Sequence, residues 1–542
     1  MIKMKDLDKK ENFNKGITLI ALVITIIVLL ILAGVTIATL IGENGNLNQA
    51  ENSKTETLKA SALEMINLAI TSNKTEDDNT LLNNLQEIEN AEIEIINIDA
   101  YYVTINGFTF TVYEDESIYT DKVQFWNGNI STDFFTGNGT EEDPYLIKNC
   151  EDMAYLANKV NNGNSFEGKY FKLIANLDFG ARKNENNEWN KLNIPYIGIN
   201  SDTPFSGTFN GDNNHIRGIG ISVYLTPGKK NKGLFGYNKG FIENIIVSGE
   251  NYIESGQFAN VGLIIGNNEG TITNCNNISR TTVAWGAYSN TGILIGSNSS
   301  EIVNCYNAGN IKTSSNISAI AGMNQENAII KNCYNTGTII GSGIAGIVYE
   351  NYGDVDFCYN RGNMDSTGQS SGIVLTNRAT GVVSNCYNTG NVRNAGICKS
   401  NFGIVKQSFN TGNVYCEGGV YIGGVVGINS NLVINCYNIG TVQTGSQVGG
   451  IVGLGTKGQV KNCYNTGTVI GSTHRNAITG NGPAGINCYY LDTSTKDSNS
   501  SVISKTKEEL QSEEMLVLLN NEEEVWTHDA NKNNGFPIII NE

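Results

Sequence analysis

The ten residues KNCYNTGTII, which run from Lys331 to Ile340, decide the fold because close copies of them recur along the chain. The same pattern reads NCYNAGNIK from Asn304 and NCYNTGTVI from Asn462. Nine copies of the four-letter core NCYN, some with substitutions, follow one another at intervals of about 27 residues. A period of this size indicates a solenoid, in which each repeat buries its apolar face against its neighbours.

The residues around each core predict the shape of one repeat. A glycine-flanked apolar patch precedes it, as in GLIIGNN from Gly262 and GILIGSN from Gly292, and a small turn with β-branched residues follows it. Such a repeat has room for three short strands and none for a helix of useful length. We therefore predict a mainly β protein, a right-handed parallel β-helix with three short strands per turn and about ten rungs, spaced ~4.8 Å apart.

Composition supports this architecture and excludes one class of partner. The 542 residues include 61 glycines but only 6 prolines, and charged residues make up 16%. This suits stacked strands with tight corners better than disorder, which requires more charge. The net charge of −17 argues against nucleic acid, because phosphate binding needs clustered lysine and arginine.

The amino-terminal region carries a membrane-spanning signal. Residues 17–41 form an uncharged run of 25 residues, ITLIALVITIIVLLILAGVTIATLI, which is long enough to cross a bilayer as a helix. Five lysines lie in the basic leader at residues 1–16, so the positive-inside tendency keeps the amino terminus in the cytoplasm. We predict a transmembrane helix at 17–41 that anchors the protein in a bacterial cell membrane, with the bulk of the chain extracellular.

The junction between Gly16 and Ile17 resembles a prepilin processing site, which is cut after a glycine that follows a basic residue. The longer string KGITLIALVITIIVLLILAGVTI is similar to the form common in Gram-positive bacteria. The resemblance implies cleavage after Gly16 and partnership with other pilin-like subunits. The chain departs from the family at Ala21, where pilins usually carry glutamate. An anchor that stays uncleaved is the alternative.

Residues 42–125 are predicted to form a small pilin-like α+β stalk. Apolar residues from Leu58 to Ala69 recur at helical spacing. The segments EIEIINI, YYVTI and FTFTVY then alternate as strands do, and Asn106-Gly107 is placed as a hairpin turn. By resemblance to pilins, we expect the helix to pack on a small sheet.

The glycine-rich patches and repeat cores together resemble the GLUG-motif repeat of bacterial adhesins, which also occurs beside the catalytic part of IgA-specific metallopeptidases. The resemblance covers residues 233–490 and implies an adhesin-like surface protein. Residues 137–232 resemble the lead-in of that family, with a capping helix expected from Glu151 to Asn161 and the first β-helix turns. Residues 491–542 are expected to form a carboxy-terminal cap of one helix and one strand.

Eight of the nine repeat cores carry a cysteine, and the ninth has Ser408 at that position. We interpret the column as reduced structural thiols that act as small apolar fillers, because serine replaces one of them. Disulfides between neighbouring rungs are the alternative, although in-register strands give poor disulfide torsions. The predicted thiol column consists of Cys275, Cys305, Cys333, Cys358, Cys386, Cys436, Cys463 and Cys488.

A tyrosine usually follows the cysteine. If exposed, this column would be an aromatic strip fit for stacking on sugars or docking a protein; if inward, it would fill the core. Because Phe409 stands in the same column, we favour core or semi-buried packing. The possible aromatic strip comprises Tyr306, Tyr334, Tyr359, Tyr387, Tyr437 and Tyr464.

The sequence lacks the motifs of enzymatic chemistry. No His-Glu-x-x-His occurs, and the three histidines, His215, His474 and His528, are widely separated. We therefore expect no catalytic residue, no cofactor and no metal site. The predicted function is a membrane-anchored, adhesin-like binding or structural protein whose β-helical rod meets an extracellular glycan or protein. A minor pilin or pseudopilin-like subunit is the alternative, and a glycan-processing β-helix enzyme is the third candidate.

Overall fold

The computed structural model describes most of the chain, and its contacts divide it into two compact units, Met1–Lys122 and Val123–Glu542. The predicted transmembrane segment at 17–41 and the Gly16–Ile17 junction lie outside the described residues. Within the described part, no helix is both long and apolar enough to cross a membrane. The described residues are 46–72, 80–183, 188–189, 194–222, 231–254, 256, 258–284 and 289–540.

In the first unit a long helix packs on a four-stranded antiparallel sheet. The helix α2 buries Ala62 and Ile66 in a core shared with the sheet. Asn106 and Gly107 have φ of 53° and 83°, the left-handed turn expected of this dipeptide in a hairpin. The elements are α2 (Asn46–Ser72), α3 (Leu81–Gln86), β1 (Glu92–Asn97), β2 (Ala100–Ile105), β3 (Phe108–Tyr113) and β4 (Ile118–Tyr119).

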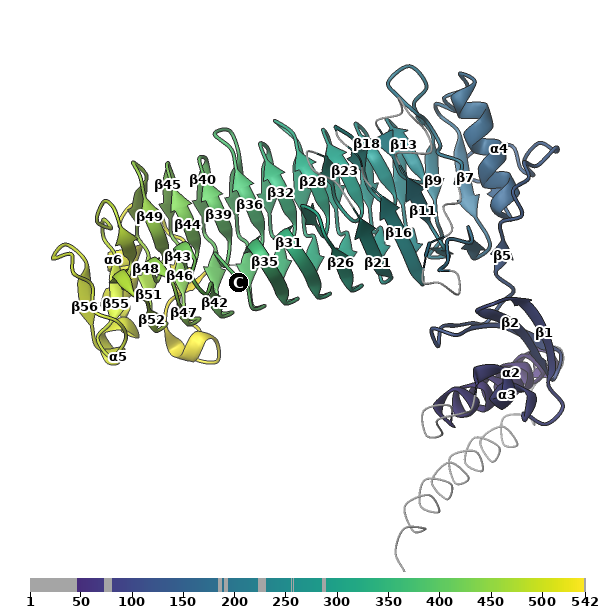
Figure 1. Cartoon of the computed structure of the whole chain (residues 1–542), viewed down its shortest axis with the longest axis horizontal. Helices are drawn as coiled ribbons and strands as arrows, with labels where there is room; N and C mark the ends of the chain where they lie inside the picture. Colours follow the sequence, from purple (N-terminus) through teal and green to yellow (C-terminus); the bar gives the residue numbers. More distant parts are fainter. Residues whose placement is uncertain are drawn as a thin grey trace, which may run out of the picture. The chain divides into compact units, whose positions relative to one another are not determined.

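The second unit is a parallel β-solenoid of about 12 turns, which confirms the predicted fold class (Figure 1). Three sheets of 14, 12 and 10 strands run along it. In one turn, β23 (Ile295–Asn298), β24 (Glu301–Val303) and β25 (Tyr306–Asn307) each pair with the corresponding strand of the next turn. About two turns more than predicted are present, because strands before residue 233 and after the last repeat core join the same sheets.

The 14-stranded sheet carries the residues after each cysteine, and we call it the tyrosine sheet. Its first strand lies within the region predicted as the stalk, which therefore ends before residue 124. The strands are β5 (Gln124–Phe125), β8 (Leu177–Asp178), β10 (His215–Arg217), β15 (Ile246–Val247), β20 (Asn276–Asn277), β25, β30 (Tyr334–Asn335), β34 (Tyr359–Asn360), β38 (Tyr387–Asn388), β41 (Phe409–Asn410), β46 (Tyr437–Asn438), β51 (Tyr464–Asn465), β55 (Tyr489–Leu491) and β56 (Ile503–Lys505).

The other two long sheets complete each turn, and a fourth side carries shorter sheets. The 12-stranded sheet runs from β6 (Tyr145–Ile147) to β50 (Gln459–Lys461), and the 10-stranded sheet from β13 (Phe235–Asn238) to β54 (Thr479–Asn481). Additional strands, which the three-strand prediction did not include, form a seven-stranded sheet that we call the lateral sheet. Its strands are β11 (Gly220–Ser222), β16 (Glu250–Glu254), β21 (Arg280–Ala284), β26 (Ile311–Thr313), β27 (Ile317–Ser318), β31 (Ile339–Ala345) and β35 (Met364–Ser371).

A left-handed residue turns the chain at each repeat core. Asn304, Asn332 and Asn385 have φ of 55°, 53° and 53°, a conformation that asparagine tolerates better than most residues. Phe357 and Gln407 adopt the same conformation at the two cores that lack this asparagine. The corner interrupts the alternation of the strand, so that the following cysteine is buried and the tyrosine after it is only half-buried in most turns.

Two columns of buried asparagine hold successive turns in register. Asn335 donates through Nδ2 to Oδ1 of Asn360 at 2.8 Å and to the carbonyl of Gly337 at 2.9 Å, and most turns repeat this pattern. A buried amide has to be hydrogen-bonded, so a slipped register would be costly. The columns are Asn277, Asn307, Asn335, Asn360, Asn388, Asn410, Asn438 and Asn465, and Asn238, Asn268, Asn298, Asn324, Asn351, Asn377, Asn401 and Asn429.

A capping helix covers the first turns, close to its predicted position. α4 (Cys150–Asn161) is N-capped by Asn149, whose side chain accepts from the N–H of Asp152 at 2.9 Å. The helix buries Leu156 and Val160 in the solenoid core. It thereby protects the apolar end of a solenoid from pairing with other chains.

Candidate binding surfaces

The thiol column lies inside the solenoid, and none of its eight cysteines is in a disulfide. Cys333 Sγ donates to the carbonyl of Lys331 at 3.2 Å, and the N–H of Cys333 donates to Sγ of Cys358 at 3.4 Å. Ser408 makes the same contacts as Cys358, whose Sγ accepts the N–H of Cys333 and donates to the carbonyl of Asp356. The Ser408 hydroxyl donates to the carbonyl of Lys406 at 2.8 Å and accepts the N–H of Cys386 at 3.2 Å. The column therefore selects a small side chain that both donates and accepts a hydrogen bond. A purely apolar filler would make neither bond.

Thiol reagents are expected to leave these cysteines unmodified in the folded protein. Burial raises the pKa of Cys275, Cys386 and Cys463 above the ordinary thiol value, so at mildly alkaline pH less of each is the reactive thiolate than for a free cysteine. Burial also raises the pKa of Cys358, but hydrogen bonds with Cys333 and Cys386 outweigh it and lower that pKa, so its buried position alone protects Cys358. Iodoacetamide labelling followed by mass spectrometry should modify the column only after denaturant is added. Labelling of a column cysteine in the native protein would contradict its buried position.

The tyrosine column lies on the outer face of the tyrosine sheet. From Tyr306 to Tyr387 the successive rings stack with centroids 4.8 Å apart and planes within 6° of parallel. These rings are half-buried, whereas Tyr437 and Tyr464 are 1% and 0% exposed. Semi-buried packing thus describes the first part of the column. Tyr437 and Tyr464 are instead buried in a second apolar core, which is separate from the core inside the solenoid.

The stacked rings occupy one another's faces, so the column presents ring edges and hydroxyl groups. The guanidinium of Arg361 lies 4.8 Å from the ring centroid of Tyr359, and its Nη2 donates to the hydroxyl of Tyr387 at 2.9 Å. Sugars stack on open aromatic faces, and rings 4.8 Å apart leave no room for one between them. The column is therefore unsuited to the sugar stacking that its sequence suggested.

The carboxy-terminal segment covers the far part of the tyrosine column. Trp526 is 2% exposed, and its ring centroid lies 5.6 Å from that of Tyr464 and 6.1 Å from that of Tyr437. The single helix predicted here is two short helices, because Ser512 accepts the N–H of Met515 and starts a second one. The elements are α5 (Lys507–Leu510), α6 (Glu513–Leu519), β57 (Trp526–Thr527) and β58 (Ile538–Ile539).

The end of the solenoid is closed by the segment before these helices. The hydroxyl of Thr495 accepts the N–H of Val469 at 2.9 Å, and the carboxylate of Asp497 accepts the N–H of Ile478 at 2.9 Å. These side chains satisfy backbone groups that a further turn would otherwise pair. The predicted cap at 491–542 therefore has two parts, one across the end and one along the side.

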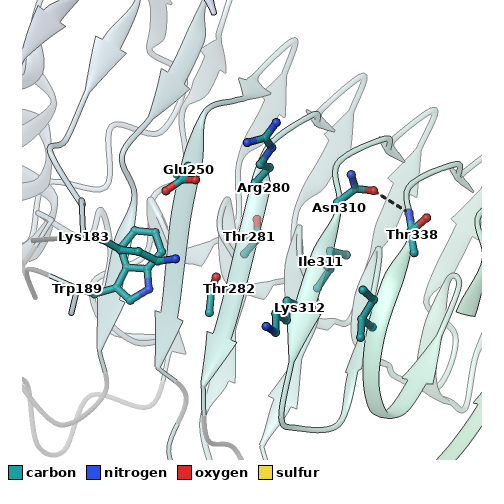
Figure 2. Close-up of a pocket in the computed structure, with 11 residues that line it drawn as sticks. Lys183, Trp189, Glu250, Arg280, Thr281, Thr282, Asn310, Ile311, Lys312 and Thr338 are labelled. Carbon is teal, nitrogen blue, oxygen red and sulfur yellow. Dashed lines mark hydrogen bonds between the residues drawn. The ribbon is translucent and has the colours of Figure 1, made fainter. Parts of the chain in front are cut away.

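A shallow groove of about 450 Å³ crosses the outer face of the lateral sheet (Figure 2). Strand pairing places Tyr252, Thr282, Lys312 and Ile340 in one row along the solenoid axis, on β16, β21, β26 and β31. Trp189 closes one end and stacks on Tyr252, with ring centroids 5.1 Å apart and planes 20° from parallel. The lining residues are Lys183, Trp189, Glu250, Arg280, Thr281, Thr282, Asn310, Ile311, Lys312, Thr338 and Ile340.

Sequence reasoning missed this groove because its residues lie outside the repeat core. Thr282 and Lys312 are 30 residues apart, whereas Lys312 and Ile340 are 28 apart, so no fixed period connects them. The signal present was the alternation of RTTVA from Arg280, which predicts one outward face of a strand. Which strands lie side by side depends on the connections between them.

Comparisons with known proteins add one motif. Residues 444–470 match the family model described as the GLUG motif. The solenoid carries a GLUG motif. The GLUG stretch corresponds to one turn, from β48 (Ser446–Gly449) to β52 (Val469–Ile470).

Among solved structures, the chain resembles a "putative immunoglobulin A1 protease" from Bacteroides ovatus, at 18% identity over 74% of this chain and 94% of that one, with a TM-score of 0.32. No curated protein matches the chain significantly.

Within the described residues, no group of three histidine, cysteine, aspartate or glutamate side chains is placed to hold a metal ion. The groove on the lateral sheet presents charged, polar and aromatic side chains on an open surface.

Proposed function

We propose that this protein is a membrane-anchored, adhesin-like binding or structural protein that presents its solenoid to an extracellular glycan or protein. The groove on the lateral sheet is the observation that supports this most, because it is an open site built across four successive turns. The GLUG motif at 444–470 and the resemblance of the repeats to adhesins support the same class. Asparagine ladders lock neighbouring turns, so the groove is held in shape before a ligand arrives.

We propose that the protein binds without chemical turnover. Glycoside hydrolysis requires two carboxyl groups that face each other across the scissile bond. Among the described residues that line the groove, Glu250 is the single acidic side chain. This composition supports recognition better than a glycan-processing enzyme.

The proposed location is the bacterial cell membrane, with the solenoid outside. The uncharged run at 17–41 after a lysine-rich leader supports it. Fractionation of the native host should recover the protein with membranes, and protease added to intact cells lacking an outer barrier should digest the solenoid. Recovery in the soluble cytoplasmic fraction would contradict the proposal.

A binding panel tests the function. The detergent-solubilised full-length protein is applied to immobilised mucin, collagen, hyaluronan and polygalacturonate, and the soluble ligands are analysed by mass spectrometry after long incubation. We expect retention on at least one surface and no change in ligand mass. Ligand cleavage would favour the enzyme, and retention on none would contradict an adhesin-like role.

A minor pilin or pseudopilin-like subunit is the second candidate, favoured by the first unit. Its long helix α2 packs on an antiparallel sheet, as expected for a pilin-like stalk. Mass spectrometry of the native amino terminus separates the two candidates. A chain that begins at Ile17 would favour filament or pseudopilus assembly, and a chain that retains Met1 or Ile2 would leave a static anchor.

A further inference from the structure

The groove gathers positive charge on a strongly acidic protein. The chain has a net charge of −17, yet three cations, Lys183, Arg280 and Lys312, line the groove against one acid, Glu250. Among the ion pairs that described residues form, none involves Arg280 or Lys312. Both side chains are exposed. Two unpaired cations on neighbouring turns are complementary to an anionic ligand.

The spacing of these cations suits a ligand that lies along the solenoid axis. Arg280 is on β21, and Lys312 is on the adjacent strand β26, which pairs with it in parallel register. Adjacent strands are ~4.8 Å apart, so the four turns of the groove span about 14 Å. Figure 2 shows Arg280 and Lys312 at different heights on the two strands, with Asn310 beside Arg280 and Thr282 beside Lys312. A short chain of acidic units could meet both cations at once.

An aromatic wall and polar side chains complete the site. The Trp189 ring, held by Tyr252, stands at one end, and the Lys183 ammonium lies 5.5 Å from its centroid. Asn310 Oδ1 accepts the N–H of Thr338 at 3.1 Å, which leaves its Nδ2 group as a donor. Tyr252 and Lys183 cover the Trp189 ring, so the ring forms a wall and not a stacking platform. Amides and hydroxyls can bond the hydroxyl groups of a sugar.

We propose that the groove on the lateral sheet binds a carboxylate-bearing glycan, with its acid groups at Arg280 and Lys312 and its hydroxyl groups at the polar side chains between them. The proposal rests on the binding function above and specifies its ligand class. A neutral glycan would leave both cations without a partner.

Isothermal titration calorimetry of the full-length protein at low ionic strength tests the assignment. The probes are a galacturonic acid trimer, a hyaluronan tetrasaccharide and a neutral galactose trimer. We expect at least one acidic probe to bind, the neutral trimer to bind at least about tenfold more weakly, and added salt to reduce the difference because exposed charges are screened. Failure of both acidic probes to bind, or equal binding of the neutral trimer, would overturn the proposal.

Matched variants locate the site. The double variant Arg280→Gln/Lys312→Gln should weaken acidic-probe binding about tenfold, since two exposed ion pairs are lost. The control variant Lys406→Gln/Lys457→Gln removes two exposed cations outside the groove. It should change the affinity for the acidic probe by less than about twofold. An equal loss in both double variants would mean a general charge effect and would overturn the site.

The failure of this assignment is distinguishable from failure of the proposed function. If the binding panel retains the wild type and the Arg280→Gln/Lys312→Gln variant equally, the adhesin-like role stands and the groove is excluded as its site. If neither the panel nor the acidic probes bind, both proposals fail.

Discussion

Replacing Asn360 with alanine is expected to destabilise the middle of the solenoid by about 3–5 kcal/mol. The fully buried Asn360 accepts from Asn335 and donates to Oδ1 of Asn388 at 2.7 Å and to the carbonyl of Gly362 at 2.9 Å. Alanine leaves these buried partners without a bond, and each unsatisfied group costs about 1–3 kcal/mol. Hydrogen exchange measured by mass spectrometry should accelerate most in the turns on either side, because a solenoid turn contacts only its neighbours.

The matched control is Asn363→Ala, three residues away on the surface. The Asn363 side chain is exposed, and its Oδ1 accepts the N–H of Asn391 at 3.1 Å where water can replace it. We expect a loss of under about 1 kcal/mol. Equal losses in the two variants would mean that the buried ladder contributes no more than a surface bond.

Replacing Trp526 with alanine is expected to release the carboxy-terminal segment from the tyrosine sheet. The ring is 2% exposed and fills a core shared with Tyr437, Tyr464 and Leu519, and truncating a buried tryptophan costs about 3–5 kcal/mol. Because the segment packs on the side of the solenoid, the turns beneath should stay folded. Limited proteolysis should cut the chain after residue 505 in the variant and spare the wild type.

Val517→Ala is the control within the same segment. Val517 on α6 is 72% exposed, so its truncation should cost under about 0.5 kcal/mol and leave the protease pattern unchanged. If Trp526→Ala instead lowers the stability of the whole solenoid, the segment is part of the cooperative fold and the view of it as a separable cover is wrong.

The repeat core explains why the fold class could be predicted. The glycine-flanked patch, the asparagine corner and the residue after the corner recur in each turn, and stacking equivalent positions buries them together. The thiol column followed from the same recurrence, and Ser408 pointed to a small side chain. The hydrogen bonds that Cys333 makes were not predictable, since they depend on the left-handed corner one residue before it.

Features outside the repeat were predicted less well. The helix expected after residue 505 divides at Ser512, whose hydroxyl competes for a backbone N–H and starts a new helix. The packing of Trp526 on Tyr464 joins residues 62 positions apart, and no periodicity in the sequence connects them. The burial of the tyrosine column also depends on that cover, because the same repeat position is half-buried in Tyr359 and buried in Tyr464.

The sequence by itself determined that this protein is a repeat-built parallel solenoid with a thiol column, asparagine-rich corners and a helix over its first turns. These features arise from residues that meet their own equivalents one turn away, so a fixed period is enough to specify them. That the thiols face inward was decided by the tertiary structure. Only the tertiary structure decided the groove between Trp189 and Ile340, the open part of the tyrosine column and the cover formed by Trp526. Each of these joins segments whose separation varies along the chain, and their contacts exist only once the connections between turns have set which side chains lie side by side.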